Sequence, residues 1–220
     1  MTPSENQRPV RPVHQERSRK TLKALLDALD RLLRDRPFES ITVLELSQAA
    51  GVSTGAFYAR FASKEDLLPE LYARFQDSLE ETTDRELDPS NWAALSIDER
   101  LERISQFLCD TYENRSWLLR AIAIHSRRRQ TTGADGDGAT TAQEKWLQKL
   151  ADCVSIAPFP NDIPRDRIEF ALYTAITVTR EAILFPHLPM ATALGLSSET
   201  MRHRLPELIR RQLGLPAERN

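Results

Sequence analysis

Residues 42–64 read TVLELSQAAGVSTGAFYARFASK, and this stretch decides the fold of the N-terminal part of the chain. Small apolar residues recur on both sides of Gly51, which can adopt the positive φ that a tight reversal of the chain requires. Ser53 is placed to cap the helix that follows the turn, and Ser63 with Asp66 is placed to cap a third helix. The pattern predicts a helix-turn-helix, the motif whose second helix lies in a DNA major groove.

The chain from Thr42 to Leu68 closely resembles the TetR family of bacterial transcription regulators, through the order T-V-x-x-L-S-x-x-A-G-V-S-x-G-A-F-Y-x-x-F-x-S-K-E-x-L-L. The resemblance extends from near Arg17 to near Phe75, about a quarter of the chain. It implies a dimeric, all-helical, DNA-binding repressor that has a small-molecule pocket in its remaining part.

The resemblance also implies which residues contact DNA. Phosphate contacts, which position a protein without reading sequence, would come from Thr42, Tyr58 and Lys64. Base edges would be read from the predicted recognition helix, residues 54–60, by Thr54, Gly55, Ala56 and Arg60. An arginine can bridge O6 and N7 of guanine, and a small residue can touch a thymine methyl group. Arg60 would point to the groove if Phe57 and Phe61 point to the core.

Composition places the chain among soluble globular proteins, since 40% of its 220 residues are apolar and 28% are charged. No apolar run is long enough to span a bilayer, and no secretory signal is present, so we expect a cytoplasmic protein without a membrane partner. Cys109 and Cys153 fit neither metal nor redox spacing, and no cofactor is expected.

The net charge of −2 hides an uneven distribution. Residues 8–36 contain nine Lys and Arg against four Asp and Glu, whereas residues 80–113 contain ten acidic residues against three basic ones. A basic head on an acidic body concentrates attraction for phosphate at one end. Charge runs of this kind also occur as ordinary solvated helix faces, and the helix-turn-helix favours the DNA-binding interpretation.

Three segments are predicted along the chain. Residues 1–16 form a disordered basic tail. Arg8, Arg11 and Arg17 either let it touch phosphate or reach into a minor groove, or the tail only aids solubility. Residues 17–77 form the helix-turn-helix domain, beginning with a helix over 17–36, and residues 78–220 form a helical effector-binding and dimerisation body.

The body is predicted to be all-α. Ser96 and Glu99 form a capping box that opens one helix. Further helices are expected over 116–129, 165–185 and 198–213. A mobile loop is expected at 131–139, and another helix follows it. In the fourth helix, which joins head and body, Pro69 predicts a kink or a late start.

The helix over 165–185 is apolar on two opposite faces, so both faces must be covered. One face can meet the body, and the other needs a partner. Together with the last helix it forms the natural dimer surface, which is also where the TetR family has its four-helix interface. The residues assigned to this interface are Ile168, Leu172, Ala175, Thr179, Ala182, Met201, Leu205, Leu208 and Ile209.

A ligand pocket is expected among the fifth to eighth helices. Its candidate lining residues are Phe107, Tyr112, Trp117, His125, Trp146, Tyr173 and Arg180. The alternative, which is the commoner role for any one of these residues, is that they simply belong to the core. Because aromatic residues outnumber charges in this set, it favours a largely apolar ligand.

The function predicted from these features is a transcriptional repressor, released from a palindromic operator by a small molecule. The alternatives are an architectural or effector-independent DNA-binding protein, and an activator. An enzyme is disfavoured, because the four histidines are far apart in the sequence and no phosphate-binding loop or nucleophile elbow is present.

Overall fold

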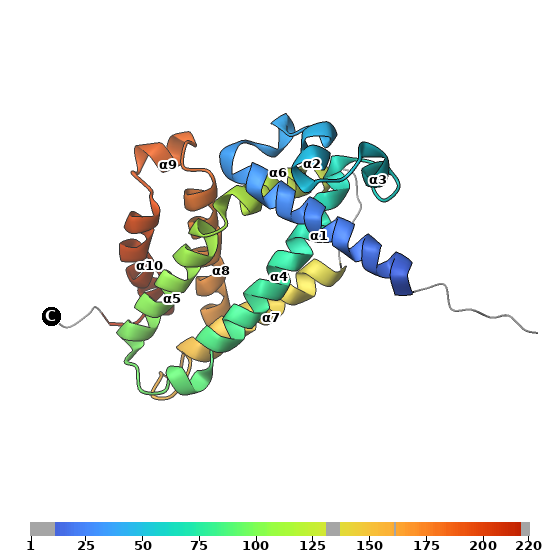
Figure 1. Ribbon diagram of the computed structural model, residues 1–220. Coiled ribbons are helices and arrows are strands. Elements are labelled where there is room, and N and C mark those ends of the chain that lie inside the picture. The colour runs from blue at the N-terminus through green and yellow to red at the C-terminus, as the bar shows by residue number, and fades with distance from the viewer. Residues whose placement is uncertain (1–11, 131–136, 161, 217–220) are drawn as a thin grey trace, which may run out of the picture. The chain divides into compact units, whose positions relative to one another are not determined.

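The computed structural model describes residues 12–130, 137–160 and 162–216, and every regular element in those residues is helical, as predicted (Figure 1). The α-helices are α1 Pro12–Asp35, α2 Val43–Ala50, α3 Thr54–Tyr58, α4 Leu67–Glu86, α5 Ile97–Glu113, α6 Ser116–Gln130, α7 Asp137–Val154, α8 Arg165–Leu184, α9 Pro189–Ala193 and α10 Ser198–Leu213. Single 3-10 turns, η1 to η3, cover Phe38–Ser40, Lys64–Asp66 and Pro89–Asn91. The chain divides into two compact units, Met1–Tyr72 and Ala73–Asn220, so the division lies five residues before the expected one.

The first unit is built on α1, which packs against α2. Its buried stripe consists of Leu25, Leu26, Ala28, Leu29 and Leu33. Helix α1 begins at Pro12, five residues before the predicted start, because a proline suits a first helical turn, where backbone N–H groups have no partner within the helix. Residues 12–16, which the sequence analysis assigned to the tail, form the first turns of α1, while Arg8 and Arg11 lie outside the described residues.

The helix-turn-helix forms at the predicted positions. Gly51 ends α2 with φ +67°, and the Ser53 hydroxyl accepts a hydrogen bond from the N–H of Ala56 at the start of α3. Helix α3 has five residues, ending two residues before the predicted boundary at Arg60. Helix α4 starts at Leu67, so Pro69 lies in its first turn and removes no hydrogen bond within the helix.

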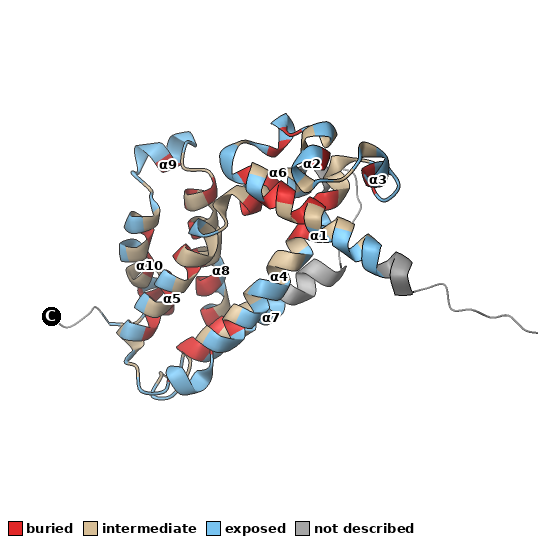
Figure 2. Ribbon diagram, in the orientation of Figure 1, coloured by how far each residue is buried: buried red, intermediate tan, exposed pale blue. Residues whose placement is uncertain are grey.

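The second unit packs α5, α8 and α10 against one another, and α7 against α5 and α8. Figure 2 shows the buried residues on the facing sides of these helices. The core of the second unit includes Trp92, Leu101, Ile104, Leu108 and Leu150. The Ser96–Glu99 capping box opens α5 as predicted. The short helix α9 was not predicted. Helix α7 begins inside the predicted 131–139 loop, of which 131–136 lie outside the described residues.

The structure corrects the assignment of one face of α8 to the dimer interface. Eight of the nine assigned residues are buried within the single chain, among them Leu172, Ala175 and Leu205 at 0% exposure, and the ninth, Leu208, is half-buried. They belong to or pack on the core of the second unit and are not available to another chain. The exposed apolar side chains of α8 are Phe170 and Tyr173, on the opposite face.

Both cysteines are buried in this second unit and neither forms a disulfide. Burial raises the pKa of the Cys109 thiol to about 11, and that of Cys153 likewise to about 11. The Cys153 thiol donates to the carbonyl oxygen of Leu87. In the part of the chain described, no helix has the length and apolar character to cross a membrane.

Candidate DNA-binding interface and body cavity

Helix α3 exposes one face because Phe57 anchors the other, and Phe61, three residues after the helix, packs against Phe57. Phe57 is fully buried and Phe61 is 8% exposed, with their rings 5.7 Å apart. The Tyr58 ring meets Phe57 edge-on but remains 58% exposed. Gly55 and Ala56 are also exposed, and Thr54 is half-buried. The surface of α3 therefore combines small side chains, which allow close approach to a base edge, with a phenol hydroxyl.

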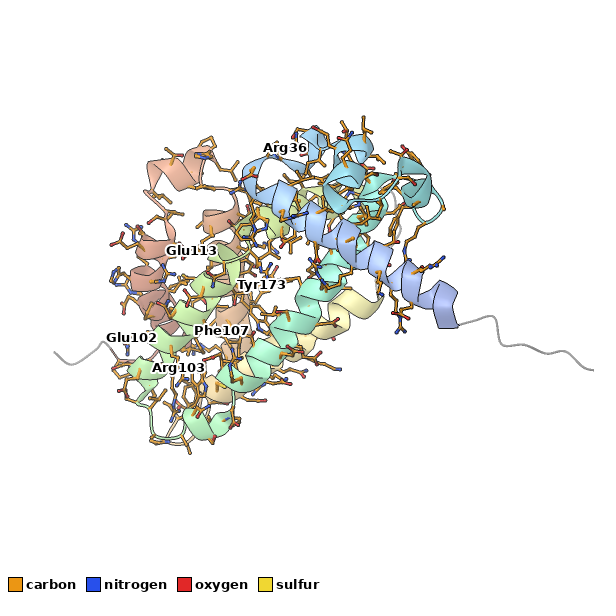
Figure 3. The ribbon with its side chains drawn as sticks, viewed as in Figure 1. Arg36, Glu102, Arg103, Phe107, Glu113 and Tyr173 are labelled. Carbon is orange, nitrogen blue, oxygen red and sulfur yellow. The ribbon has the colours of Figure 1, made fainter. Side chains whose placement is uncertain are left out.

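Thr42 is the N-cap of α2, a role the sequence analysis did not assign. Its hydroxyl accepts from the N–H of Glu45 at 3.2 Å and donates to the Glu45 carboxylate at 2.7 Å. The Glu45 carboxylate also accepts from the backbone N–H of Thr42 and from Arg36, which is labelled in Figure 3. The Thr42 bonds, followed by those from Arg36, lower the pKa of Glu45 from 4.5 to about 2. Thr42 and Glu45 thus fix the start of α2.

Lys64 is bound inside the first unit. Its ammonium group donates to the carbonyl oxygens of Phe38, Glu39 and Ile41 at 2.9, 3.1 and 2.7 Å, and it lies 4.7 Å from the centre of the Phe38 ring. An ammonium has three N–H donors, and all three have partners here. The geometry therefore differs from the predicted phosphate contact: Lys64 ties the start of the fourth helix to the turn before α2.

Arg60 is also held within the unit. Its guanidinium donates to both the carbonyl oxygen and the hydroxyl of Ser18 on α1, the former at 3.0 Å. It also lies over the Phe61 ring, 5.7 Å from the centroid. Phe57 and Phe61 do point to the core, but the Arg60 side chain turns towards α1. Its predicted role as a base reader remains a prediction, and it requires release from Ser18.

The second unit contains a cavity of about 470 Å³ beside α4, η3 and α5. Figure 3 labels Arg103 and Phe107, which lie one turn apart on α5. The apolar lining of the cavity consists of Phe75, Leu79, Leu87, Trp92 and Phe107. The polar lining of the cavity consists of Ser78, Thr82, Glu86, Arg103, Gln106, Asp110, Thr111, Asn114 and Arg115. The lining of the cavity thus combines aromatic and aliphatic side chains with polar and charged ones.

The charged groups of the lining have partners. Arg103 stacks on Trp92 at 5.1 Å and donates to the carbonyl oxygen of Asn91. The Asp110 carboxylate accepts from Gln106 at 2.8 Å and from Arg202 of α10 at 2.8 Å. With two arginines and two carboxylates, the lining is formally neutral.

Of the seven predicted pocket residues, Phe107 is the one that lines this cavity, and Trp146 packs against it with ring centres 6.3 Å apart. Tyr173 is 58% exposed on α8, and Arg180 pairs with Glu181 at 3.9 Å. Tyr112, Trp117 and His125 are half-buried and do not line the cavity. This cavity therefore lies beside α4 and α5, and six of the seven predicted pocket residues are outside its lining.

Sequence reasoning missed Trp92, Arg103 and Gln106. Trp92 is fully buried, and its indole N–H donates to the carbonyl oxygen of Glu86 at 2.8 Å. It follows a break in the helical pattern, where the sequence does not predict a buried aromatic residue. Arg103 and Gln106 lie on the polar face of the amphipathic α5, so their pattern indicated solvent. In the described parts of the chain, no group of three or more His, Cys, Asp or Glu side chains could hold a metal ion.

Comparison with known proteins finds a family match within the first unit. Residues 25–71 match the family model of bacterial regulatory proteins of the tetR family. A curated relative from Bacillus subtilis (strain 168), the uncharacterized HTH-type transcriptional regulator YwcC, is 31% identical over 108 residues, which are 48% of each chain. The match thus spans about half the length of this relative. Both the family and the relative are transcription regulators rather than enzymes.

Two solved structures share the fold over nearly the whole chain. A putative TetR-family transcriptional regulator from Rhodococcus sp. aligns with a TM-score of 0.54 and 19% identity, over 90% of this chain and 99% of that one. A tetR-family regulator from Streptomyces coelicolor aligns with a TM-score of 0.51 and 20% identity, over 93% and 91%. At these identities the likeness concerns the fold.

Proposed function

Because the chain belongs to the TetR family of bacterial transcription regulators, we propose that it is a homodimeric repressor, released from a palindromic operator by a small, largely apolar molecule. The DNA-binding part of this proposal rests on one observation about α3: Gly55, Ala56 and Tyr58 are exposed while Phe57 is buried. This helix lies within the matched region, residues 25–71. A protein with this role works where the bacterial chromosome is, in the cytoplasm.

The effector is proposed to bind in the cavity beside α4 and α5. Its aromatic and aliphatic lining residues favour a largely apolar ligand, and its formally neutral polar lining favours an uncharged ligand that has hydrogen-bonding groups. The hydroxyl protons of Thr82 and Thr111 are donated to their own helices, so these oxygens offer acceptors. A cavity of this size supports a ligand-responsive regulator over an effector-independent one.

The signal from the cavity to the head is proposed to pass through α4. This single helix carries Phe75 and Leu79 in the cavity lining, and its first turns, up to Tyr72, belong to the DNA-binding unit. A ligand that displaces these side chains acts directly on the helix. The coupling expected between ligand and DNA is about 1–3 kcal/mol, a five- to 150-fold change in DNA affinity.

Dimerisation is proposed to use α8 and α10, with the exposed Phe170 and Tyr173 in place of the face first assigned. Single large apolar side chains on a surface are ordinary, but two of them one turn apart on a long helix favour a contact with a second copy. A twofold dimer presents two recognition helices to two half-sites, which accounts for an inverted repeat.

Selection of bound duplexes from a random pool, followed by titration of the full chain, tests the proposal. We expect enrichment of an inverted repeat, and binding at least 1,000-fold tighter than to a scrambled duplex, the lower end for specific DNA-binding proteins. Failure to enrich any sequence, with equal affinity for both duplexes, would contradict operator recognition. An enriched site without inverted symmetry would contradict the dimeric arrangement.

A further inference from the structure

Helix α1 extends well beyond the core on which it packs. From Glu16 onwards, where burial is described, the first buried side chain of α1 is Leu25, whereas the helix begins at Pro12. Between residues 16 and 24 every side chain is exposed or half-buried. At about 1.5 Å per residue, the helix before Leu25 is roughly 20 Å long. Figure 1 shows these first turns running out past α2 and α3 of the same unit.

This extension is strongly basic. Residues 16–23, ERSRKTLK, contain four basic side chains and one acidic one. Lys20 pairs with Glu16 at 3.1 Å and Lys23 pairs with Asp27 at 2.8 Å. Arg17 and Arg19 are exposed, and neither is paired with an acidic side chain in the described part of the chain. Two guanidinium groups are therefore available on the surface.

The extension passes next to the end of the recognition helix. Ser18, between these two arginines in the sequence, accepts hydrogen bonds from Arg60, two residues after the end of α3. The bond fixes this turn of α1 beside the surface that carries Tyr58. Arg17 and Arg19 precede and follow Ser18 on the helix, each about 100° around the axis from it. The two guanidinium groups therefore leave α1 on either side of this contact.

We propose that the first turns of α1 form a second phosphate-binding element, in which Arg17 and Arg19 contact the DNA backbone next to the groove that α3 enters. The proposal rests on the DNA-binding function proposed above. Guanidinium groups suit this role because their paired N–H donors match two phosphate oxygens. Contacts of this kind add affinity for every DNA sequence equally and do not read bases.

The test compares the full chain with the double variant Arg17→Gln/Arg19→Gln on the selected operator and on scrambled DNA, at several salt concentrations. The matched control is Arg85→Gln/Lys145→Gln, which removes the same charge from exposed positions of the second unit. Each lost phosphate contact lowers the slope of log affinity against log salt by about 0.9. We expect a decrease of up to about 1.8 per protomer, an equal fold-loss on both duplexes, and no change in the control.

The conservative variant Arg17→Lys/Arg19→Lys retains both charges and should keep a salt slope close to that of the parent chain. An unchanged slope for the glutamine variant, beside normal operator binding by the parent chain, would overturn the proposal and leave the operator-binding function intact. A loss confined to the operator would also overturn it, because it would indicate base reading. If the parent chain itself does not prefer the operator, the proposed function fails instead.

Discussion

Lys64 Nζ lies 2.7 Å from the carbonyl oxygen of Ile41, the residue directly before the N-cap of α2. The two residues are 23 positions apart, and the bond joins the turn that opens the fourth helix to the turn that opens the second. The carbonyl oxygens of Phe38 and Glu39 complete the set of acceptors. A lysine implied to bind phosphate thus holds together the unit that would present the other contacts.

Replacing Lys64 by Met should therefore affect stability first. Three carbonyl oxygens lose a charged donor, and we expect the free energy of unfolding to fall by roughly 1–3 kcal/mol. The control Lys23→Met removes an exposed pair with Asp27 and should cost about 0.3–0.5 kcal/mol. Urea unfolding measures both. A Lys64 variant of unchanged stability, whose salt slope for DNA binding falls by about one unit, would restore the phosphate role.

The low pKa of Glu45 predicts how acid affects the first unit. Its folded pKa, about 2, lies below its ordinary 4.5, so its contribution to stability is complete above about pH 4.5 and is lost as the pH falls towards 2. Glu45→Gln should remove this part of the pH dependence, whereas Glu80→Gln, an exposed position on α4, should retain it. Melting temperatures between pH 2 and 7 test the expectation. Parallel curves for the parent chain and Glu45→Gln would contradict it.

The cavity can be tested by filling it. Thr111 donates its hydroxyl proton to the carbonyl oxygen of Phe107 in its own helix, so Thr111→Phe breaks no bond between helices and places a ring in the cavity. We expect the neutral fluorescent probe N-phenyl-1-naphthylamine to bind the parent chain and Thr111→Ser but not Thr111→Phe. DNA affinity without ligand should be the same for all three. Equal probe binding by all three would place the ligand site elsewhere.

The two faces of α8 should respond differently to charge. Phe170→Glu/Tyr173→Glu alters exposed side chains and should give folded monomers with weakened operator binding. Leu172→Glu places an unpaired carboxylate in the core and should unfold the second unit. Light scattering and circular dichroism separate these outcomes. A folded dimer from the Phe170 and Tyr173 variant would place the interface on other residues.

The local features of the fold were predictable because their signals are local. Gly51 at the turn, Ser53 at the start of α3, and Ser96 with Glu99 at the start of α5 all act within three residues of their own position. Helix α10 has the predicted bounds, since Ser197 caps it and Gly214 ends it with φ +73°. The Thr42–Glu45 capping box is a local signal of the same kind, because its two residues are three positions apart.

The tertiary features were not predictable by the same means. Helix α8 has apolar residues on two faces, and periodicity alone cannot say which face meets the core. Leu172 was therefore assigned to the dimer interface although it is buried in the core, whereas Phe170 is exposed. The partners of Lys64 and Arg60 lie 23 to 42 positions away, beyond any helical spacing. The cavity depends on how Trp92 and α4 meet α5, which no single helix pattern contains.

Because Cys109 and Cys153 are buried, we expect that thiol reagents do not modify the folded chain. Thiols with pKa values near 11 form little thiolate at neutral pH, and both are shielded from solvent. A single cysteine introduced at the exposed Ala59 would then be the one site that takes up a nitroxide label. In a dimer, two such labels report the separation of the recognition helices by electron spin resonance. That separation can be compared directly with the 34–36 Å between successive major grooves on one side of a duplex.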